Sequence, residues 1–300
     1  MRKLVDAATS GASWLSLRRE AFRSDYNERP FLVEHRLPEH PAFQLDALRA
    51  LCHRMPRRLV RHRFGAIPHD VEFDKSLEMY GKDLSFEDAV DRLEENKAYL
   101  ALYNPEQDPE YRPIIEGLLG ELAVETEQLE PGLNWYSTYI FISTQDSLTP
   151  YHMDREMNFL LQIRGTKHVQ LWDPRDNMVM SAAERDRLLA QQAEPRPGWH
   201  DGLPARAMTF DLVPGVGVHH PFIAPHLVRT CSDLSISLAI TFRTEQSDRW
   251  TDAHRFNQLV RRVGVTPRTV GDAPLVDRGK ARVIRTVRRA RQTWRGLARS

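Results

Sequence analysis

The sequence predicts a mainly β protein with flanking helices, in which antiparallel strands form a sandwich or barrel. From Asn134 onward the chain contains short runs rich in β-branched and aromatic residues, separated by Gly and Pro. Such runs are typical of antiparallel all-β folds, whereas the segments on either side carry apolar residues at helical spacing. We therefore expect a mixed α/β region at 1–130 that packs on the core, a β core at 131–245, and a helical region with a basic tail at 246–300.

Each expected element follows from a local pattern. The predicted strands lie in WYSTYIFIST, FLLQIRGTKHVQLWD, MTFDLVPGVGVHH and LSISLAITFRT. Pro30 ends a helix because its ring cannot continue one, and Ser85 is a typical N-cap. The remaining expectations are a helix within 1–30, an extended run at 30–35, helices at 43–52, 85–100 and 114–129, a surface insertion at 181–200, and a helix after Arg243.

Composition excludes several classes of protein. Of the 300 residues, 41% are hydrophobic and 28% are charged, which is ordinary globular usage and argues against disorder. No run is long and apolar enough to cross a bilayer, and the start lacks a secretory signal, so we expect a cytoplasmic protein. Cys52 and Cys231 stand far apart, which argues against a disulfide framework or a structural zinc site.

The candidate chemistry lies where His152 and Asp154 immediately precede a strong strand. Residues i and i+2 of a strand point the same way, so an imidazole and a carboxylate can reach one point. His226 ends the segment PGVGVHHPFIAPH and is the candidate third ligand. Two His and one carboxylate on one face of a metal suit ferrous iron. Alone, however, an H-x-D pair is a weak motif, and a surface or core pair is the common alternative.

The surrounding residues strengthen this interpretation. Thr149 lies three residues before His152, Asn158 six after it and Lys167 fifteen after it, and Pro214, Gly215, Pro221 and His226 follow a second fixed spacing. With these spacings, the segments 149–174 and 214–242 resemble the JmjC or cupin-like family of 2-oxoglutarate oxygenases. Within that family they resemble the asparaginyl hydroxylase that modifies hypoxia-inducible factor. The resemblance implies a double-stranded β-helix (jelly-roll) core, with Fe(II) held by His152, Asp154 and His226 and 2-oxoglutarate as co-substrate.

The same resemblance implies roles for other residues. Lys167 would bind the far carboxylate of 2-oxoglutarate; its alternative is an exposed strand lysine. Thr149 would donate a hydroxyl to that carboxylate, and Tyr99 would share the task unless it merely packs against the sheet. Asn158 would support the co-substrate or orient a metal ligand. Thr241, fifteen residues after His226, replaces a family Asn and would donate one hydrogen bond.

Two adjacent histidines depart from the family pattern. His219 and His220 stand where relatives have apolar residues, and Val216 replaces an acid. Neighbouring strand residues point to opposite faces, so one imidazole would enter the barrel and the other would leave it. The favoured interpretation is a hydrogen-bonded core histidine, with a catalytic or substrate-contact role as the alternative. The sequence does not decide which of the two approaches the metal.

The implied reaction is hydroxylation of a C–H bond in a protein side chain or a small molecule, with decarboxylation of 2-oxoglutarate to succinate. Lysine demethylation is a related possibility that the sequence leaves open. An alternative is a non-catalytic metal-binding cupin that acts as a regulatory or interaction module. Lys167 and Thr149 argue against it, because a non-catalytic module has no need of a co-substrate anchor.

Two basic stretches carry further expectations. The segment 53–64 is interpreted as the solvated face of a helix, although it could hold an acidic peptide. The tail 280–300 holds eight Lys or Arg and no acid, which leaves 34 basic against 41 acidic residues elsewhere. That tail would dock on this protein or a twin subunit, or contact nucleic acid or anionic membrane as an interaction module. A homodimer through the helices after Arg243 is expected from apolar residues at helical spacing, namely Phe256, Leu259, Val260 and Val263.

Overall fold

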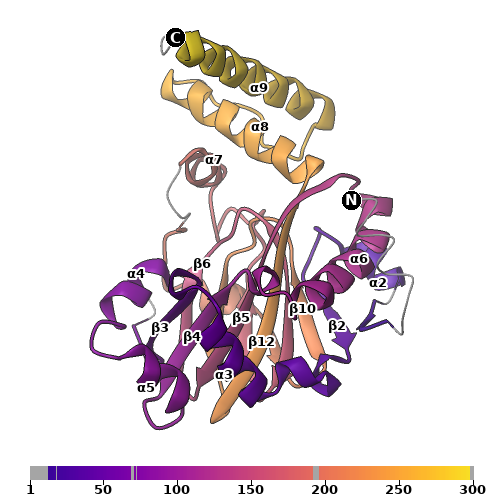
Figure 1. Ribbon diagram of the computed structural model, residues 1–300. Helices are drawn as coiled ribbons and strands as arrows, with labels where there is room; N and C mark the ends of the chain where they lie inside the picture. Colours follow the sequence, from indigo (N-terminus) through magenta and orange to yellow (C-terminus); the bar gives the residue numbers. More distant parts are fainter. Residues whose placement is uncertain (1–12, 18, 69–70, 72, 192–195, 298–300) are drawn as a thin grey trace.

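Two antiparallel sheets form the centre of the computed structural model (Figure 1), which describes residues 13–17, 19–68, 71, 73–191 and 196–297. From one edge to the other, the large sheet contains β1 (Leu15–Ser16), β2 (Leu32–His35), β10 (Val216–His220), β7 (Met157–Arg164), β12 (Leu234–Thr244), β5 (Leu133–Thr144), β4 (Ala98–Tyr103) and β3 (Val60–Phe64). From one of its edges to the other, the small sheet contains β6 (Leu148–His152), β11 (His226–Thr230), β8 (Lys167–Leu171) and β9 (Met208–Leu212).

The strands from β5 to β12 form a double-stranded β-helix, as the sequence predicts. Along this part of the chain, four strands join the large sheet and four join the small one, and every pairing is antiparallel. Strands β1 and β2 extend the large sheet beyond β10, and β3 and β4 extend it beyond β5. The segment before residue 131 therefore supplies strands to the same sheet that builds the barrel.

Helices surround this sandwich on one face and at one end. Helices α3 and α6 lie over the outer face of the large sheet, and α8 and α9 lie together beyond one end of the barrel (Figure 1). The helices are α2 (Arg19–Asp25), α3 (Leu45–Arg54), α4 (Phe73–Met79), α5 (Phe86–Asp91), α6 (Arg112–Leu129), α7 (Ala182–Ala190), α8 (Glu245–Arg262) and α9 (Pro274–Leu297). Short 3₁₀ turns lie at Leu37–Glu39, Pro41–Phe43, Arg57–Leu59, Pro105–Gln107 and Pro204–Arg206.

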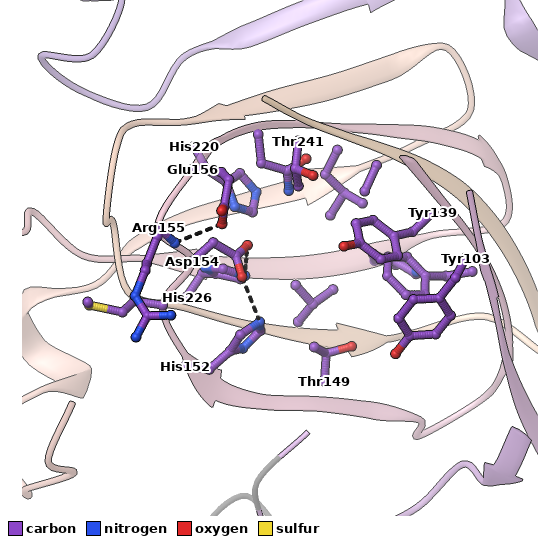
Figure 2. Close-up of a pocket in the computed structure, with 17 residues that line it drawn as sticks. Tyr103, Tyr139, Thr149, His152, Asp154, Arg155, Glu156, His220, His226 and Thr241 are labelled. Carbon is purple, nitrogen blue, oxygen red and sulfur yellow. Dashed lines mark hydrogen bonds and ion pairs between the residues drawn. The ribbon is translucent and has the colours of Figure 1, made fainter. Parts of the chain in front are cut away.

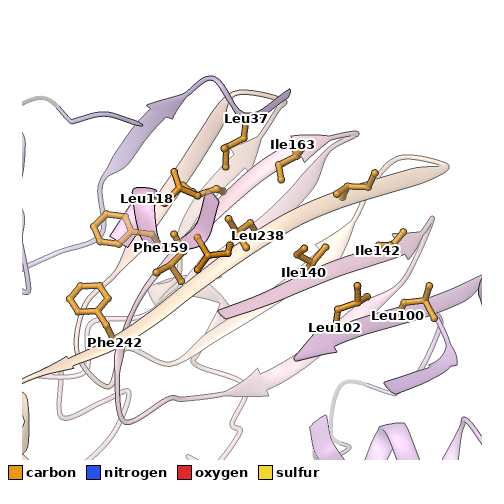
Figure 3. Close-up of a cluster of buried hydrophobic side chains, with 14 of the residues drawn as sticks. Leu37, Leu100, Leu102, Leu118, Ile140, Ile142, Phe159, Ile163, Leu238 and Phe242 are labelled. Atoms are coloured by element: carbon orange, nitrogen blue, oxygen red, sulfur yellow. The ribbon is translucent and has the colours of Figure 1, made fainter. Parts of the chain in front are cut away.

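Alternation along β12 separates the main core from the inside of the barrel. Leu238, Ile240 and Phe242 join the large cluster between the sheet and its helices, where Leu118 of α6 also lies (Figure 3). The intervening residue Ala239 instead joins a smaller cluster between the two sheets. Because successive strand residues point to opposite faces, the apolar positions of one strand stabilise the helical layer while its other positions face the barrel interior.

Several sequence expectations fail at the N-terminal region. Leu15–Ser16 is a strand and α2 ends at Asp25, while residues 1–12 of the predicted first helix lie outside the described residues. Ser85 does cap a helix, with its hydroxyl accepting a hydrogen bond from Asp88 N, but α5 ends at Asp91 and β4 begins at Ala98. Pairing of β4 with both β3 and β5 outweighs the helical pattern there.

The segment 53–64 is also not a continuous helix. Val60–Phe64 is an edge strand of the large sheet, and the Arg63 side chain is fully buried. Its guanidinium donates to the carbonyl oxygens of Phe64, Gly65 and Leu148 at 2.7, 2.8 and 2.6 Å. These bonds offset the cost of burying the charge, so Arg63 does not belong to a solvated basic face.

The insertion between β8 and β9 is packed rather than superficial. Its helix α7 carries Asp186, a buried carboxylate that accepts hydrogen bonds from His254 and Arg261 of α8, each at 2.7 Å, and from Asn257 at 3.3 Å. Helix α8 itself begins with a capping box between Thr244 and Ser247. No helix in the described part of the chain is both long and apolar enough to cross a bilayer.

Candidate metal centre

A cavity of about 260 Å³ opens between the two sheets, and most of the residues singled out in the sequence line it (Figure 2). His152 is the last residue of β6 and His226 the first of β11, and these two residues are direct partners in the antiparallel ladder. Asp154 follows β6 by two residues. One donor atom from each of His152, Asp154 and His226 lies within 4.8 Å of the others.

Hydrogen bonds fix the orientation of both imidazoles. His152 Nδ1 donates to Pro150 O at 2.7 Å, and His226 Nδ1 donates to Ala224 O at 3.1 Å. These bonds select the tautomer that has its lone pair on Nε2, and the Nε2 atoms lie 3.9 and 3.8 Å from the Asp154 carboxylate oxygens. Burial holds the pKa of His226 well below its usual value, so this ring is neutral. Two oriented imidazoles with their Nε2 atoms beside a carboxylate fit a divalent metal.

The turn before His226 is strained. Ile223 has φ of 57°, a left-handed conformation that is unfavourable for a β-branched residue. Such strain persists only where surrounding contacts enforce it. In this turn Ile223 is buried in the main core, and the next residue supplies the carbonyl that orients His226. The core thus helps to set the direction of this imidazole.

Lys167 reaches the same cavity from the start of β8. Gly165 has φ of 67° in the turn before it, and a Cβ there would lie 2.1 Å from Leu234 O, so the turn requires glycine. Lys167 is 3% exposed, its Nζ donates to Ser237 Oγ at 2.7 Å, and it forms no ion pair among the described residues. Burial lowers the pKa of Lys167 to about 7. A buried amine without an acidic partner suits an anionic ligand.

Thr149 lines the cavity, but Tyr99 lies behind it. The two hydroxyl oxygens are 3.2 Å apart, and Tyr99 is not among the cavity-lining residues. The Tyr99 ring instead packs under Arg63, whose Cζ lies 4.1 Å from the ring centroid. Burial lowers the pKa of Arg63 to about 10. The position of Tyr99 therefore agrees with the packing alternative, and its role in binding the co-substrate stays a prediction.

Asn158 and Thr241 face the cavity from adjacent strands of the large sheet. They are direct partners in the ladder between β7 and β12. Asn158 Oδ1 is buried without a hydrogen-bond partner in the described part of the chain. Thr241 Oγ1 donates to Ser137 O at 2.7 Å, and the hydrogen bond from Thr241 to the co-substrate stays a prediction.

The adjacent histidines differ completely in environment. His219 is a core residue: its ring packs on Tyr26, Phe31 and Phe159, and burial lowers its pKa to about 3. His220 lines the cavity, with its ring centroid 4.6 Å from that of His226. Neither ring nitrogen of His220 has a hydrogen-bond partner among the residues the structure describes. His220 is therefore the imidazole that approaches the metal ligands.

Sequence reasoning missed several cavity residues. Glu156 is largely buried, and its carboxylate accepts hydrogen bonds from Arg243, while burial and Asp154 raise its pKa. Tyr103, Tyr139 and Arg155 also line the cavity. The alternation of His152, Asp154, Glu156 and Asn158 at every second position was a signal for Glu156, although residues 153–156 form the turn between β6 and β7 and not a continuous strand.

Comparison with known protein families identifies the fold. A family model described as a cupin-like domain matches residues 27–267. This chain belongs to the cupin-like family. Solved structures similar to this cupin-like chain include YcfD of Escherichia coli, with 17% sequence identity, a TM-score of 0.49, and coverage of 91% of this chain and 67% of that one.

Two further similarities complete the comparison. A structure of the ribosomal oxygenase YcfD in complex with cobalt and 2-oxoglutarate has 16% identity, a TM-score of 0.47, and coverage of 91% of this chain and 66% of that one, so this chain spans about two thirds of its length. The DMSP lyase DddQ of Ruegeria pomeroyi has 15% identity, a TM-score of 0.23, and coverage of 36% and 38%. No curated protein sequence matches this chain.

Proposed function

We propose that this cupin-like protein is an Fe(II)- and 2-oxoglutarate-dependent oxygenase that hydroxylates a C–H bond of a protein side chain or a small molecule. One observation carries the proposal. A His–Asp–His cluster and a buried lysine without an acidic partner among the described residues face the same cavity. A metal at one end and a cation at the other match a keto acid that chelates through one end and carries a carboxylate at the other.

His152, Asp154 and His226 would hold the metal. Three ligands on one side leave the remaining coordination positions to the co-substrate and oxygen. When bound, ferrous iron would supply oxygen activation, coupled to decarboxylation of 2-oxoglutarate to succinate and carbon dioxide. The protein's own contribution is to fix the imidazole tautomers through Pro150 O and Ala224 O.

Lys167 and Thr149 would bind the far carboxylate of 2-oxoglutarate. Lys167 would take up a proton as that carboxylate arrives, because an opposite charge in a buried site favours the ammonium form. Thr149 contributes a hydroxyl beside the same end of the cavity. Asn158, whose Oδ1 has no partner among the described residues, offers an amide to the metal-bound end or to a ligand side chain.

A non-catalytic cupin module is the weaker alternative. Burying an amine without an anion destabilises a folded protein, and a module that only interacts with other proteins gains nothing from it. The cavity position of Lys167 thus supports a protein that binds an anionic co-substrate. Its prime substrate would enter past Arg155 and Glu156, which line the cavity beyond Asp154.

The test is an anaerobic calorimetric titration of the protein with Fe(II) and then 2-oxoglutarate, followed by measurement of succinate after oxygen is admitted. The proposal expects 2-oxoglutarate to bind only after the metal and succinate to accumulate slowly even without prime substrate. Asp154→Ala should abolish both signals, whereas Arg164→Gln on the exposed surface of β7 should preserve them. Metal binding without any 2-oxoglutarate binding would favour the non-catalytic alternative.

A further inference from the structure

Two additional hollows lie along the C-terminal helices, next to the metal cavity. The first, of about 630 Å³, lies between the barrel and helices α8 and α9, and Arg155 lines both it and the metal cavity. The second, of about 320 Å³, shares Arg285 and Arg289 with the first. We name their basic lining the arginine track, which consists of Arg155, Arg243, Arg249, Arg255, Arg278, Arg282, Arg285, Arg288 and Arg289.

The arginine track carries more positive charge than its acids neutralise. Among the described residues, only three carboxylates line the first hollow and no acidic residue lines the second. The Asp252 side chain is 3% exposed and pairs with Arg255, Arg285 and Arg288 at 3.2, 2.9 and 3.6 Å. One buried carboxylate therefore holds three guanidiniums in place and leaves most of their charge facing the hollow.

Two exposed members of the track add further positive charge. Arg282 and Arg289 form no ion pair within the part of the chain that the structure describes. From Arg278 to Arg289 the track follows α9 for about 17 Å at the rise of an α-helix. That length matches about five residues of an extended peptide.

We propose that the arginine track binds an acidic, extended polypeptide segment and thereby directs the neighbouring target residue into the metal cavity. This inference rests on the proposed function, and it specifies the substrate as a polypeptide with Asp or Glu beside the modified position. Guanidinium groups bind carboxylates in a bidentate, planar arrangement, and a row of them attracts an acidic chain from solution. Because Arg155 lines both the first hollow and the metal cavity, a segment bound in that hollow would lie beside the metal centre.

The lining favours a peptide over a nucleic acid. No aromatic residue of the described ranges lines either hollow, whereas proteins that bind single strands usually stack bases on aromatic side chains. The first hollow also contains Asn134, Thr251 and the carboxylate of Asp248, which can accept hydrogen bonds from peptide N–H groups. A phosphodiester backbone offers no such donors.

Fluorescence anisotropy with the full chain tests the proposal without metal or 2-oxoglutarate. The probes are labelled short peptides of alternating Glu and Gly, the matching Lys and Gly peptide, and a single-stranded oligonucleotide of equal length. The Glu peptide should bind the wild type, and its affinity should fall as the salt concentration increases. Its affinity for the Arg282→Glu/Arg289→Glu variant should be lower by about tenfold or more. The matched control, Arg58→Glu/Arg164→Glu, removes two exposed arginines outside the arginine track, one in the 3₁₀ turn before β3 and one at the end of β7, and should preserve binding.

Several results would overturn the proposal. They are no binding of the Glu peptide, an equal loss in the control variant, or tighter binding of the oligonucleotide than of the Glu peptide. Arg282→Gln/Arg289→Gln, with circular dichroism, separates loss of charge from loss of fold. Because these measurements need no iron, a failure of oxygenase chemistry would not affect them. Conversely, the Arg282→Glu/Arg289→Glu variant should still bind Fe(II) and 2-oxoglutarate like the wild type if the proposed function is correct.

Discussion

Replacing Lys167 with Met should stabilise the ligand-free protein while it weakens binding of 2-oxoglutarate. Methionine has nearly the same length as lysine, fills the same buried space and carries no charge. Burial lowers the pKa of Lys167 from 10.5 to about 7, which means that folding disfavours the ammonium form. Between these pH values the unfolded chain binds a proton that the folded chain releases, so wild-type stability increases with pH across this window.

The size of the effect follows from the pKa shift. A pH of 8 lies 2.5 units below 10.5, the pKa of lysine in the unfolded chain. Folding at pH 8 must therefore remove a proton from this lysine, which lowers the free energy of unfolding by about 3 kcal/mol. Loss of the hydrogen bond to Ser237 offsets about 1 kcal/mol of the gain in the variant. We therefore expect Lys167→Met to raise the free energy of unfolding by about 2 kcal/mol at pH 8. This advantage should shrink by roughly 2 kcal/mol at pH 10.

Urea unfolding of wild type and Lys167→Met at pH 8 and pH 10 measures this difference. Subtracting the wild-type free energy of unfolding from that of the variant at each pH cancels the contributions of all other titrating groups. Calorimetry in buffers of different ionisation enthalpy then measures how many protons each protein takes up when 2-oxoglutarate binds. Wild type at pH 8 should take up about one proton with 2-oxoglutarate, because the ligand's carboxylate restores the ammonium. Lys167→Met should take up none. Equal affinity and equal proton uptake in both proteins would refute the anchor role.

Three further outcomes are expected. Asp154→Ala should weaken Co(II) binding at least about a hundredfold in an absorption titration, and unchanged binding would mean that other donors hold the metal. His220→Leu should keep or raise the thermal unfolding temperature, because it removes two buried ring nitrogens that have no hydrogen-bond partner among the described residues. A large decrease in the unfolding temperature would mean that these nitrogens do form stabilising hydrogen bonds. Light scattering should give a dimer for the full chain and a monomer for Leu259→Glu/Val263→Glu, since both side chains are exposed at the C-terminal end of α8, by 50% and 77%. A wild-type monomer at micromolar concentration would exclude this interface.

The metal cluster was predictable because it depends on short-range spacing. His152 ends β6 and Asp154 lies two residues beyond it in the turn, so these two ligands come together without any long-range contact, although the strand period assumed in the prediction ends at His152. His226 required a different kind of information. Its place opposite His152 depends on how β11 pairs with β6, and only the spacing of the preceding prolines and glycine indicated it.

Other assignments depended on tertiary contacts that local patterns do not contain. His219 and His220 have the same chemistry and adjacent positions, so only the pairing of β10 with β7 and β2 decides which faces the cavity. Arg63 looked like part of a solvated helical face because its neighbours are basic. Its burial follows from three backbone carbonyls, two of them beyond its own strand, that converge on one guanidinium.

The insertion at 172–207 joins the ends of two strands that remain paired throughout. The ladder runs from Lys167 opposite Leu212 to Leu171 opposite Met208, so the chain leaves and re-enters the small sheet at the same place. During evolution this insertion can change in length or sequence while Lys167 keeps its position. Asp186 in the same insertion accepts hydrogen bonds from helix α8. Substitutions around Asp186 would therefore also alter how the C-terminal helices approach the cavity. The insertion also contacts the neighbours of the ligands, because Trp172 N donates to Pro225 O at 3.0 Å and Arg155 donates to Gln191 O at 2.8 Å. A change in this one segment can therefore act on both the C-terminal helices and the rim of the metal centre.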